Sequence, residues 1–204
     1  YEVPFKIVYG YTNRGFSEAN NLGAKHASGE YLIFMNSDVI PKDIEWAKEL
    51  VEFLEENQDA GAVAPLLLFP NESIQHMGMV FIENKFYNIY FNHHIFMGLP
   101  PEKVIDENKP IECEMLTGAL ICISKNLFEK IGGWSYDFVK GDFEDSDFSL
   151  KIRSIGKKLY VLPWVKMYHL EGASQQFTPE RFSRTLMNAR ILKYKFKELG
   201  LGGK

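Results

Sequence analysis

Short apolar runs alternate along the chain with polar loops and with segments of helical periodicity. The segment at 5–9 has the pattern of a strand. Residues 31–35 and 60–68 form apolar runs of strand length, which are typical of strands buried on both faces of a parallel sheet. Between the segments at 5–9 and 31–35, Ser17 and the segment after it predict a helix that ends at Gly29. This order predicts a β-loop-α-β unit whose two strands are parallel.

The remainder of the chain predicts further elements around an irregular middle segment. Pro41 begins a predicted helix that runs to about Glu56, with Ile44 in its apolar stripe. Residues 71–112 are rich in Asn, His, Phe and Tyr and have poor periodicity, apart from a strand at 77–82. The later predicted elements are strands at 115–123, 159–163 and 165–168 and helices at 125–131, 145–155 and 179–199.

Length and composition restrict the class of protein. A chain of 204 residues that is 46% apolar can bury one sizeable core, and neither a repeat nor a linker divides it, so we expect a single domain over 1–204. A net charge of −4 argues against nucleic acid as a partner. The apolar runs are too short to span a membrane, the first residues do not resemble a signal peptide, and two cysteines make no disulfide framework. We therefore expect a cytoplasmic protein.

Three ionisable residues stand at the ends of predicted elements. Asp38 follows the strand at 31–35, His169 follows the strand at 165–168, and Asp145 shares the inward face of its helix with the core residues. Each of them alone has an ordinary structural explanation, such as helix capping for the aspartate. Together they could meet at one rim, where a carboxylate and a histidine can hold a divalent metal and a second carboxylate can act as a base.

Other familiar chemical motifs are missing from the sequence. It has no HExxH, CxxC, GxSxG or Walker A pattern, and its glycines are too widely spaced for a dinucleotide fingerprint. His76, His93 and His94 form a second histidine group, but their spacing fits no specific zinc signature.

Four segments, in order, resemble one known family. They are Asn13–Gly23, Gly29–Asp38, Thr117–Ala119, and a last series made of Gly132-Gly133-Trp134, Phe143–Phe148, Pro163 and His169. These segments are similar to motifs of the inverting family 2 nucleotide-sugar glycosyltransferases. The resemblance implies an α/β, Rossmann-like GT-A fold with a mixed, mostly parallel sheet flanked by helices. It divides the domain into the remainder of a nucleotide-binding half (1–70), an acceptor and catalytic half (71–178) and a C-terminal helix and tail (179–204).

The resemblance also implies roles for individual residues. Asp38 and His169 would bind Mn²⁺ or Mg²⁺, and Asp145 would be the general base, with its pKa raised by its neighbour Glu144 and by partial burial. The donor nucleotide sugar and its pocket would be contacted by Asn13, Gly15, Asn21, Asn36, Asp38, Thr117, Gly118, Trp134 and Glu144. The implied reaction is metal-dependent, inverting transfer of a sugar from a nucleoside diphosphate to an acceptor hydroxyl, in bacterial-type polysaccharide or glycoconjugate synthesis.

The sequence departs from the family pattern in two places. The metal-binding DxD motif reads Asn36-Ser-Asp38, so an amide replaces its first carboxylate. The run at 5–9 is similar to the third strand of the family, so the strand–helix–strand opening that binds base and ribose is expected to be missing here. A catalytically incomplete binding or assembly module is therefore the main alternative. A nucleotidyltransferase is a third reading, but it would require a glycine-rich, basic loop at its start, which this chain does not show.

The expected partners are a nucleotide-sugar donor and a carbohydrate or lipid-linked acceptor. The helix at 179–199 carries several Lys and Arg residues among apolar ones. It either contacts a membrane peripherally, at the inner face, or packs on the core with a solvated basic face. The sequence leaves open the nucleotide base, the sugar, the acceptor and whether the chain forms a homo-oligomer.

Overall fold

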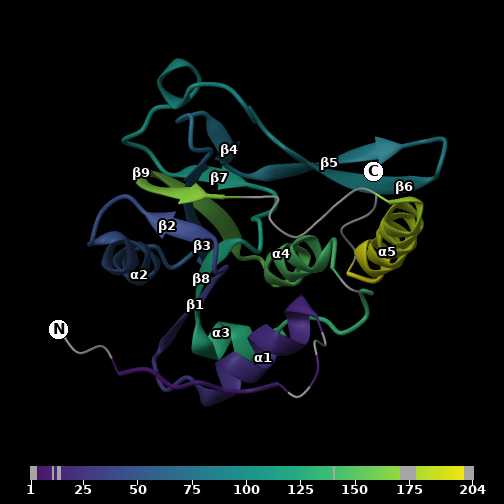
Figure 1. Ribbon diagram of the computed structural model, residues 1–204, viewed down its shortest axis with the longest axis horizontal. Helices are drawn as coiled ribbons and strands as arrows, with labels where there is room; N and C mark the ends of the chain where they lie inside the picture. Colours follow the sequence, from purple (N-terminus) through teal and green to yellow (C-terminus); the bar gives the residue numbers. More distant parts are fainter. Residues whose placement is uncertain (1–3, 11, 13–14, 140, 171–177, 200–204) are drawn as a thin grey trace.

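A computed structural model describes residues 4–10, 12, 15–139, 141–170 and 178–199 of the chain (Figure 1). The helices are α1 (Phe16–His26), α2 (Trp46–Glu56), α3 (Lys125–Lys130), α4 (Glu144–Ser154) and α5 (Pro179–Glu198), with a 3-10 turn η1 (Pro101–Lys103). The strands are β1 (Tyr31–Met35), β2 (Val39–Pro41), β3 (Ala60–Leu68), β4 (Ile74–His76), β5 (Met79–Asn84), β6 (Ile89–His94), β7 (Ile111–Cys113), β8 (Leu120–Ser124) and β9 (Lys158–His169).

The main sheet is mixed and has the strand order β1-β8-β3-β9-β2, with β4 added to β3 and β7 added to β9. Among the described strands, only β3 and β9 pair in parallel, and the other pairings are antiparallel. Parallel pairing is thus less extensive than the sequence suggested. The mixed α/β sheet with flanking helices agrees with the expected fold class.

The predicted strand at 5–9 is wrong. This segment has no assigned strand structure, and Phe5 and Tyr9 are 85% and 81% exposed. An apolar run becomes a strand only when a neighbour takes up its backbone hydrogen bonds, and no described strand pairs with it. β1 is consequently an edge strand in the described sheet, and it buries alternate residues, Leu32 and Phe34, instead of both faces.

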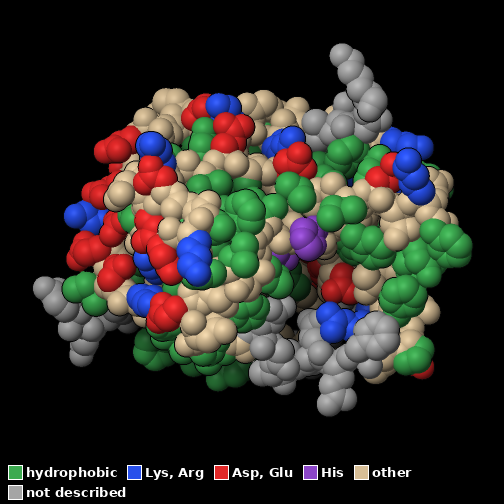
Figure 2. Space-filling model, turned by 90° about the horizontal axis from the view of Figure 1, so that it is seen from above, with side chains coloured by type: hydrophobic (Ala, Val, Ile, Leu, Met, Phe, Trp, Pro, Cys, Tyr) green, Lys and Arg blue, Asp and Glu red, His purple; other side chains and the backbone are tan. Residues whose placement is uncertain are grey.

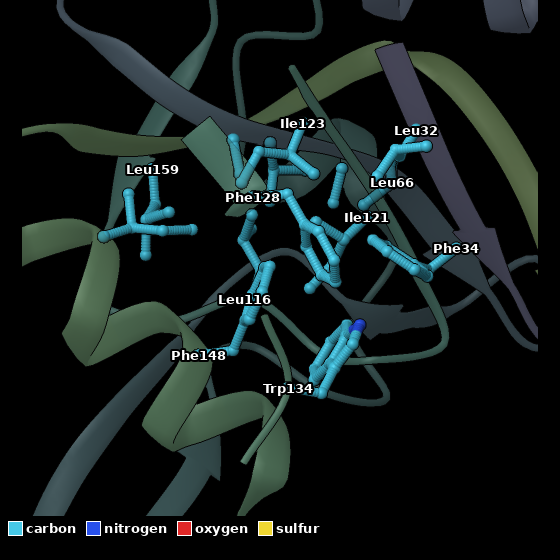
Figure 3. Packing of buried hydrophobic residues seen from close by; sticks show 14 of the residues in the cluster. Leu32, Phe34, Leu66, Leu116, Ile121, Ile123, Phe128, Trp134, Phe148 and Leu159 are labelled. Atoms are coloured by element: carbon cyan, nitrogen blue, oxygen red, sulfur yellow. The ribbon is translucent and has the colours of Figure 1, made fainter. Parts of the chain in front are cut away.

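Helices cover the sheet on both faces, and β3 lies in the centre. Every residue of β3 is buried, as the run at 60–68 predicted. One cluster of buried residues joins β1, β3 and β8 to α1, α3 and α4, and a second joins the opposite face to α2. In the first cluster Trp134 stacks on Phe148 with ring centroids 4.1 Å apart, and Phe34 meets Trp134 edge-on (Figure 3).

Helix α2 begins later than predicted. Residues 39–41 pair with β9 as β2, so they are unavailable to a helix, and α2 starts at Trp46. Ile44, expected in the apolar stripe of this helix, precedes it and is 91% exposed. Sheet pairing therefore overrides the local helical pattern at this point.

The middle of the chain is more regular than its sequence suggested. Strands β5 and β6 form an antiparallel hairpin of their own, and α5 packs against it, with Phe81 and Phe196 ring centroids 5.1 Å apart. The side chains of Ala189 and Leu192 are buried in this contact, so α5 packs on the protein along its apolar side (Figure 1).

The two strand pieces predicted at 159–163 and 165–168 form one long strand, β9. A register shift opposite Pro163 and Val165 lets this strand pass its proline without ending. Helices α3 and α4 match their predictions closely, whereas β8 starts only at Leu120. Among the described residues, the helices are too short or too polar to cross a bilayer.

Candidate active site

A cleft of about 560 Å³ opens between the sheet, the β5–β6 hairpin and the N-terminal ends of α4 and α5. Acidic and histidine side chains gather in the hollow on this face (Figure 2). The structure brings together the predicted site residues Asn36, Asp38, Thr117, Gly118, Glu144, Asp145 and His169, all of which line the cleft.

Asp38 and His169 are placed side by side by strand pairing. The antiparallel pairing of β2 with β9 sets Val39 opposite His169, and the Leu170 amide donates a hydrogen bond of 3.0 Å to the Asp38 carbonyl. As a result, Oδ1 of Asp38 lies 3.3 Å from Nε2 of His169. The two residues are 131 positions apart in the sequence, so their contact depends on the sheet register.

Gln75 on β4 fixes the orientation of the histidine ring. Nδ1 of His169 lies 2.7 Å from the Gln75 Oε1, and the Gln75 Nε2 donates to the His169 carbonyl over 3.0 Å. Because Oε1 can only accept, Nδ1 of His169 carries the proton and donates it. The lone pair of a neutral His169 Nε2 then faces a carboxylate oxygen. A cation bound between these two atoms would use both lone pairs.

This donor set fits a divalent cation with few protein ligands. An imidazole nitrogen and a carboxylate oxygen are both suitable ligands for Mn²⁺, and a hydrogen bond to the far ring nitrogen is the usual support for a metal-binding histidine. Within the described residues, no group of three or more His, Cys, Asp or Glu side chains could enclose a metal. A cation at Asp38 and His169 would therefore need oxygens from substrate or water.

Asp145 lines the same cleft as this pair and lies in the first turn of α4. Its Oδ2 accepts a hydrogen bond of 3.2 Å from the Gly118 amide, and its Oδ1 accepts one of 2.8 Å from the Ser146 amide. Burial raises the pKa of Asp145, and the hydrogen bonds from Gly118 and Ser146 oppose that shift. A carboxylate with this raised pKa is a suitable proton acceptor near neutral pH.

Gly118 is needed for this close packing. A Cβ at this position would lie 2.9 Å from Cζ of Phe16 and 3.6 Å from the Cβ of Asp145. The missing side chain therefore lets the backbone amide of Gly118 approach the carboxylate while Phe16 closes the other side.

Glu144 precedes the base and is 6% exposed. Burial, and to a smaller extent the neighbouring carboxylates of Asp145 and Asp142, raise the pKa of Glu144 to about 7. The loop before α4 is unusual, because Asp142 and Phe143 both have positive φ angles, 74° and 75°. Asp142 is held by Thr185, whose hydroxyl donates over 2.6 Å, and Arg181 approaches it to 3.6 Å.

Two residues expected at the donor site do not line the cleft. Trp134 is completely buried behind Phe16, with ring centroids 4.9 Å apart, so its role in shaping the sugar pocket stays a prediction. Asn21 is also buried, and its amide makes two hydrogen bonds to the backbone of Trp134, of 2.8 Å and 3.0 Å. The side chain of Asn21 therefore holds the backbone of Trp134 in place, and its contact with a nucleotide stays a prediction.

Among the described residues of the Asn13–Gly23 segment, one residue lines the cleft. Gly15 is the N-cap residue of α1, with a φ of 91°, and its neighbour Phe16 is the residue that lines the cleft. Asn13 lies outside the described residues.

The structure adds site residues that the sequence reading did not assign. Asn92 and His94 of β6 line the cleft, Gln75 of β4 supports His169, and Arg181 of α5 reaches the rim. Three of these lie in 71–112, where periodicity failed. The histidine group of this segment was visible in the sequence, but its spacing did not show that His94 would face the cleft.

The fold is that of a nucleotide-sugar transferase of the GT-A type. The chain aligns with the crystal structure of GalNAc-T7 with UDP, GalNAc and Mn²⁺ at a TM-score of 0.70 and 18% identity, over 96% of this chain and 38% of that one. It also aligns with the mannosyltransferase PcManGT from Pyrobaculum calidifontis, in complex with GDP-Man and Mn²⁺, at a TM-score of 0.53 and 16% identity, over 98% of this chain and 58% of that one.

The chain belongs to glycosyl transferase family 2, whose family model matches residues 1–132, and is thus of the glycosyltransferase class of enzymes. It is 31% identical over 162 residues to the O-antigen biosynthesis protein RfbC of Myxococcus xanthus, covering 77% of this chain and 12% of RfbC. It is 27% identical over 188 residues to the uncharacterized protein y4gI of Sinorhizobium fredii, covering 89% of this chain and 20% of y4gI. The chain thus spans a fifth or less of these two relatives.

Proposed function

We propose that this domain transfers a sugar from a nucleoside diphosphate to an acceptor hydroxyl, with the help of a divalent cation and with inversion at C1. The observation that carries the proposal is the pair formed by Asp38 and His169, oriented by Gln75 and facing the same cleft as Asp145. A metal-binding pair and a base that share one cleft are what this reaction requires.

Asp38 and His169 would hold Mn²⁺ or Mg²⁺ through one oxygen and one nitrogen. The cation supplies charge stabilisation for the diphosphate as it leaves. The protein contributes by aiming both ligands before the donor binds, because strand pairing and Gln75 restrict their side chains. Asn36 lines the cleft beside them and offers an amide to the donor.

Asp145 would take the proton of the acceptor hydroxyl. In this step the acceptor oxygen forms a bond to C1 of the sugar, and the bond from C1 to the diphosphate oxygen breaks. The electron pair of the broken bond stays on the diphosphate, and the acceptor proton moves to the Asp145 carboxylate. Attack from the face opposite the leaving group inverts the anomeric centre.

The relatives support the chemical class of the donor and product. The two structural neighbours contain UDP with GalNAc, or GDP-Man, and both contain Mn²⁺. RfbC is an O-antigen biosynthesis protein, and this relationship supports a role in polysaccharide synthesis. We infer a bacterial-type polysaccharide or glycoconjugate pathway with a carbohydrate or lipid-linked acceptor. A peripheral membrane contact and a homo-oligomer stay predictions.

Calorimetry tests the metal role. UDP-, GDP- and dTDP-sugars are titrated into the chain with Mn²⁺, with Mg²⁺ and with EDTA, and into the variants Asp38→Ala and Asp43→Ala. We expect cation-dependent binding of at least one donor, lost in Asp38→Ala and kept in the exposed control Asp43→Ala. Binding that ignores the cation, or that survives Asp38→Ala, refutes the metal role. Donor binding without turnover for any tested acceptor would instead favour the incomplete binding module.

A further inference from the structure

Strand β6 presents two polar side chains to the cleft. Asn92 and His94 are two residues apart, so they share one face of the strand, and both line the cleft. His93, between them, points to the other face and is exposed. Neither Asn92 nor His94 takes part in the transfer step proposed above.

The proton position on His94 follows from a chain of hydrogen bonds. His76 is fully buried, and burial lowers its pKa well below the usual range, so its ring is neutral. Its Nε2 accepts from the Thr117 amide over 3.3 Å, which leaves the proton on Nδ1. This Nδ1 lies 3.1 Å from Nδ1 of His94 and donates to it. Because Nδ1 of His94 accepts, its ring proton is on Nε2.

Asn92 is connected to the proposed base on its other side. The Asn92 Nδ2 donates to the Ser146 hydroxyl over 3.1 Å, and Ser146 contacts Oδ1 of Asp145 through both its amide and its hydroxyl. Oδ2 of Asp145 accepts from the amide of Gly118, which follows Thr117, the partner of His76. Oδ1 of Asp145 is therefore connected to Asn92 through Ser146. Oδ2 is connected to His94 through Gly118, Thr117 and His76.

The number of hydrogen bonds that each oxygen of Asp145 can still accept indicates where the acceptor hydroxyl binds. Each carboxylate oxygen can accept about two hydrogen bonds. Among the described residues Oδ1 has contacts from the Ser146 amide and hydroxyl, whereas Oδ2 has one, from Gly118. A hydroxyl that approaches Oδ2 enters a cleft whose hairpin wall carries Asn92 and His94.

We propose that the polar face of β6 binds the acceptor, with the Nε2–H of His94 and the amide of Asn92 hydrogen-bonded to hydroxyls of a sugar ring next to Asp145. This inference rests on the proposed function. It assigns the acceptor as a polyhydroxylated sugar unit, because an N–H donor and a carboxamide, spaced two residues apart on a strand, match neighbouring hydroxyls.

Saturation-transfer NMR measures acceptor binding separately from binding at the donor site. A panel of methyl glycosides of glucose, galactose, mannose, rhamnose and N-acetylglucosamine is added to the chain with UDP or GDP and Mg²⁺, and nucleotide affinity is measured in parallel by calorimetry. We expect at least one glycoside to bind at millimolar concentration. His94→Ala and Asn92→Ala should each weaken it about three- to tenfold, the value of one hydrogen bond, with nucleotide affinity unchanged.

Two further variants distinguish binding from a structural effect. His94→Gln keeps an N–H donor and should restore much of the glycoside affinity, and His93→Ala, on the opposite face of the same strand, should leave it unchanged. Thermal unfolding checks that all variants fold. The proposal is overturned if no glycoside binds the wild type, or if both alanine variants bind as tightly as the wild type. If the wild type binds neither UDP nor GDP, the result refutes the proposed function instead.

Discussion

Gln75 and His169 contact each other at two points. Nδ1 of His169 lies 2.7 Å from Oε1 of Gln75, and Nε2 of Gln75 donates to the His169 carbonyl over 3.0 Å. These contacts aim the remaining ring nitrogen at Asp38. A glutamine that no sequence motif marks thus determines which nitrogen of the proposed metal ligand faces the cleft.

Replacing Gln75 by leucine should weaken cation binding. The ring of His169 would lose the acceptor that holds its proton on Nδ1, and support of this kind is typically worth 10–100-fold in metal affinity. We expect a loss of about tenfold in Mn²⁺ affinity, measured by calorimetry in the presence of UDP or GDP. The exposed Gln58→Leu is the control, and equal affinities in the two variants would show that Gln75 does not support the ligand.

Asp145→Asn should abolish transfer while donor affinity stays within about twofold. An amide cannot take the acceptor proton, and general-base catalysis contributes about 10²–10⁴-fold. Transfer is measured as release of nucleoside diphosphate with saturating donor and acceptor. Asp137→Asn, an exposed carboxylate paired with Lys195, is the matched control. Turnover above about one per cent of wild type in Asp145→Asn would exclude it as the base.

The pH dependence of transfer should report the same carboxylate. Burial raises the pKa of Asp145 above its ordinary value of 3.8, and only the ionised form accepts a proton. Transfer efficiency should therefore fall as the pH is lowered through this raised pKa. A flat profile down to pH 4, with the fold intact by circular dichroism, would contradict this assignment.

Glu144→Gln should stabilise the protein at neutral pH. The carboxyl of Glu144 titrates near 4.5 when unfolded and near 7 when folded. Below pH 4.5 the Glu144 carboxyl is protonated in both the folded and the unfolded protein, so its burial does not lower stability. Between pH 4.5 and 7 the unfolded state ionises first, so the wild type loses stability over this window, by about 3 kcal/mol at most.

Denaturant unfolding at pH 4.5 and pH 8 measures this effect. The difference in free energy of unfolding between Glu144→Gln and wild type should be small at the lower pH and larger, in favour of the variant, at the higher pH. The exposed Glu129→Gln corrects for a general change in net charge. A difference that does not vary with pH would mean that folding does not raise the pKa of Glu144.

Asn21→Ala should reduce stability and leave nucleotide binding unchanged. The amide of Asn21 satisfies two buried backbone groups of Trp134, and leaving them without partners costs about 2–3 kcal/mol. Urea unfolding gives the loss, with Asn20→Ala as control, since Asn20 bonds only within its own helix, to the Phe16 carbonyl. If Asn21→Ala instead lowers donor affinity without changing stability, the side chain has the nucleotide role that family resemblance implied.

Much of the framework was predictable from local pattern. Uninterrupted apolar residues marked β3, and periodicity with the glycines that follow each helix marked α1, α3 and α4, because burial and helix ends impose requirements on nearby residues alone. The predicted N-cap residue of α1, Ser17, lies inside the helix, whose N-cap residue is Gly15. The middle segment was not predictable in this way. The hairpin of β5 and β6 is stabilised by α5, about a hundred residues later, and no local signal records that contact.

Family motifs in the sequence determined which fold and which class of enzyme this chain represents, and placed Asp38, Asp145 and His169 at the ends of elements. Tertiary structure alone decided which residues face the cleft. It placed Gln75, Asn92 and His94 beside the site and buried Asn21 and Trp134. The physical reason is that spacing along a chain specifies the face of one element, whereas a cleft is made where several elements meet, and their registers are set by the packing of the whole sheet.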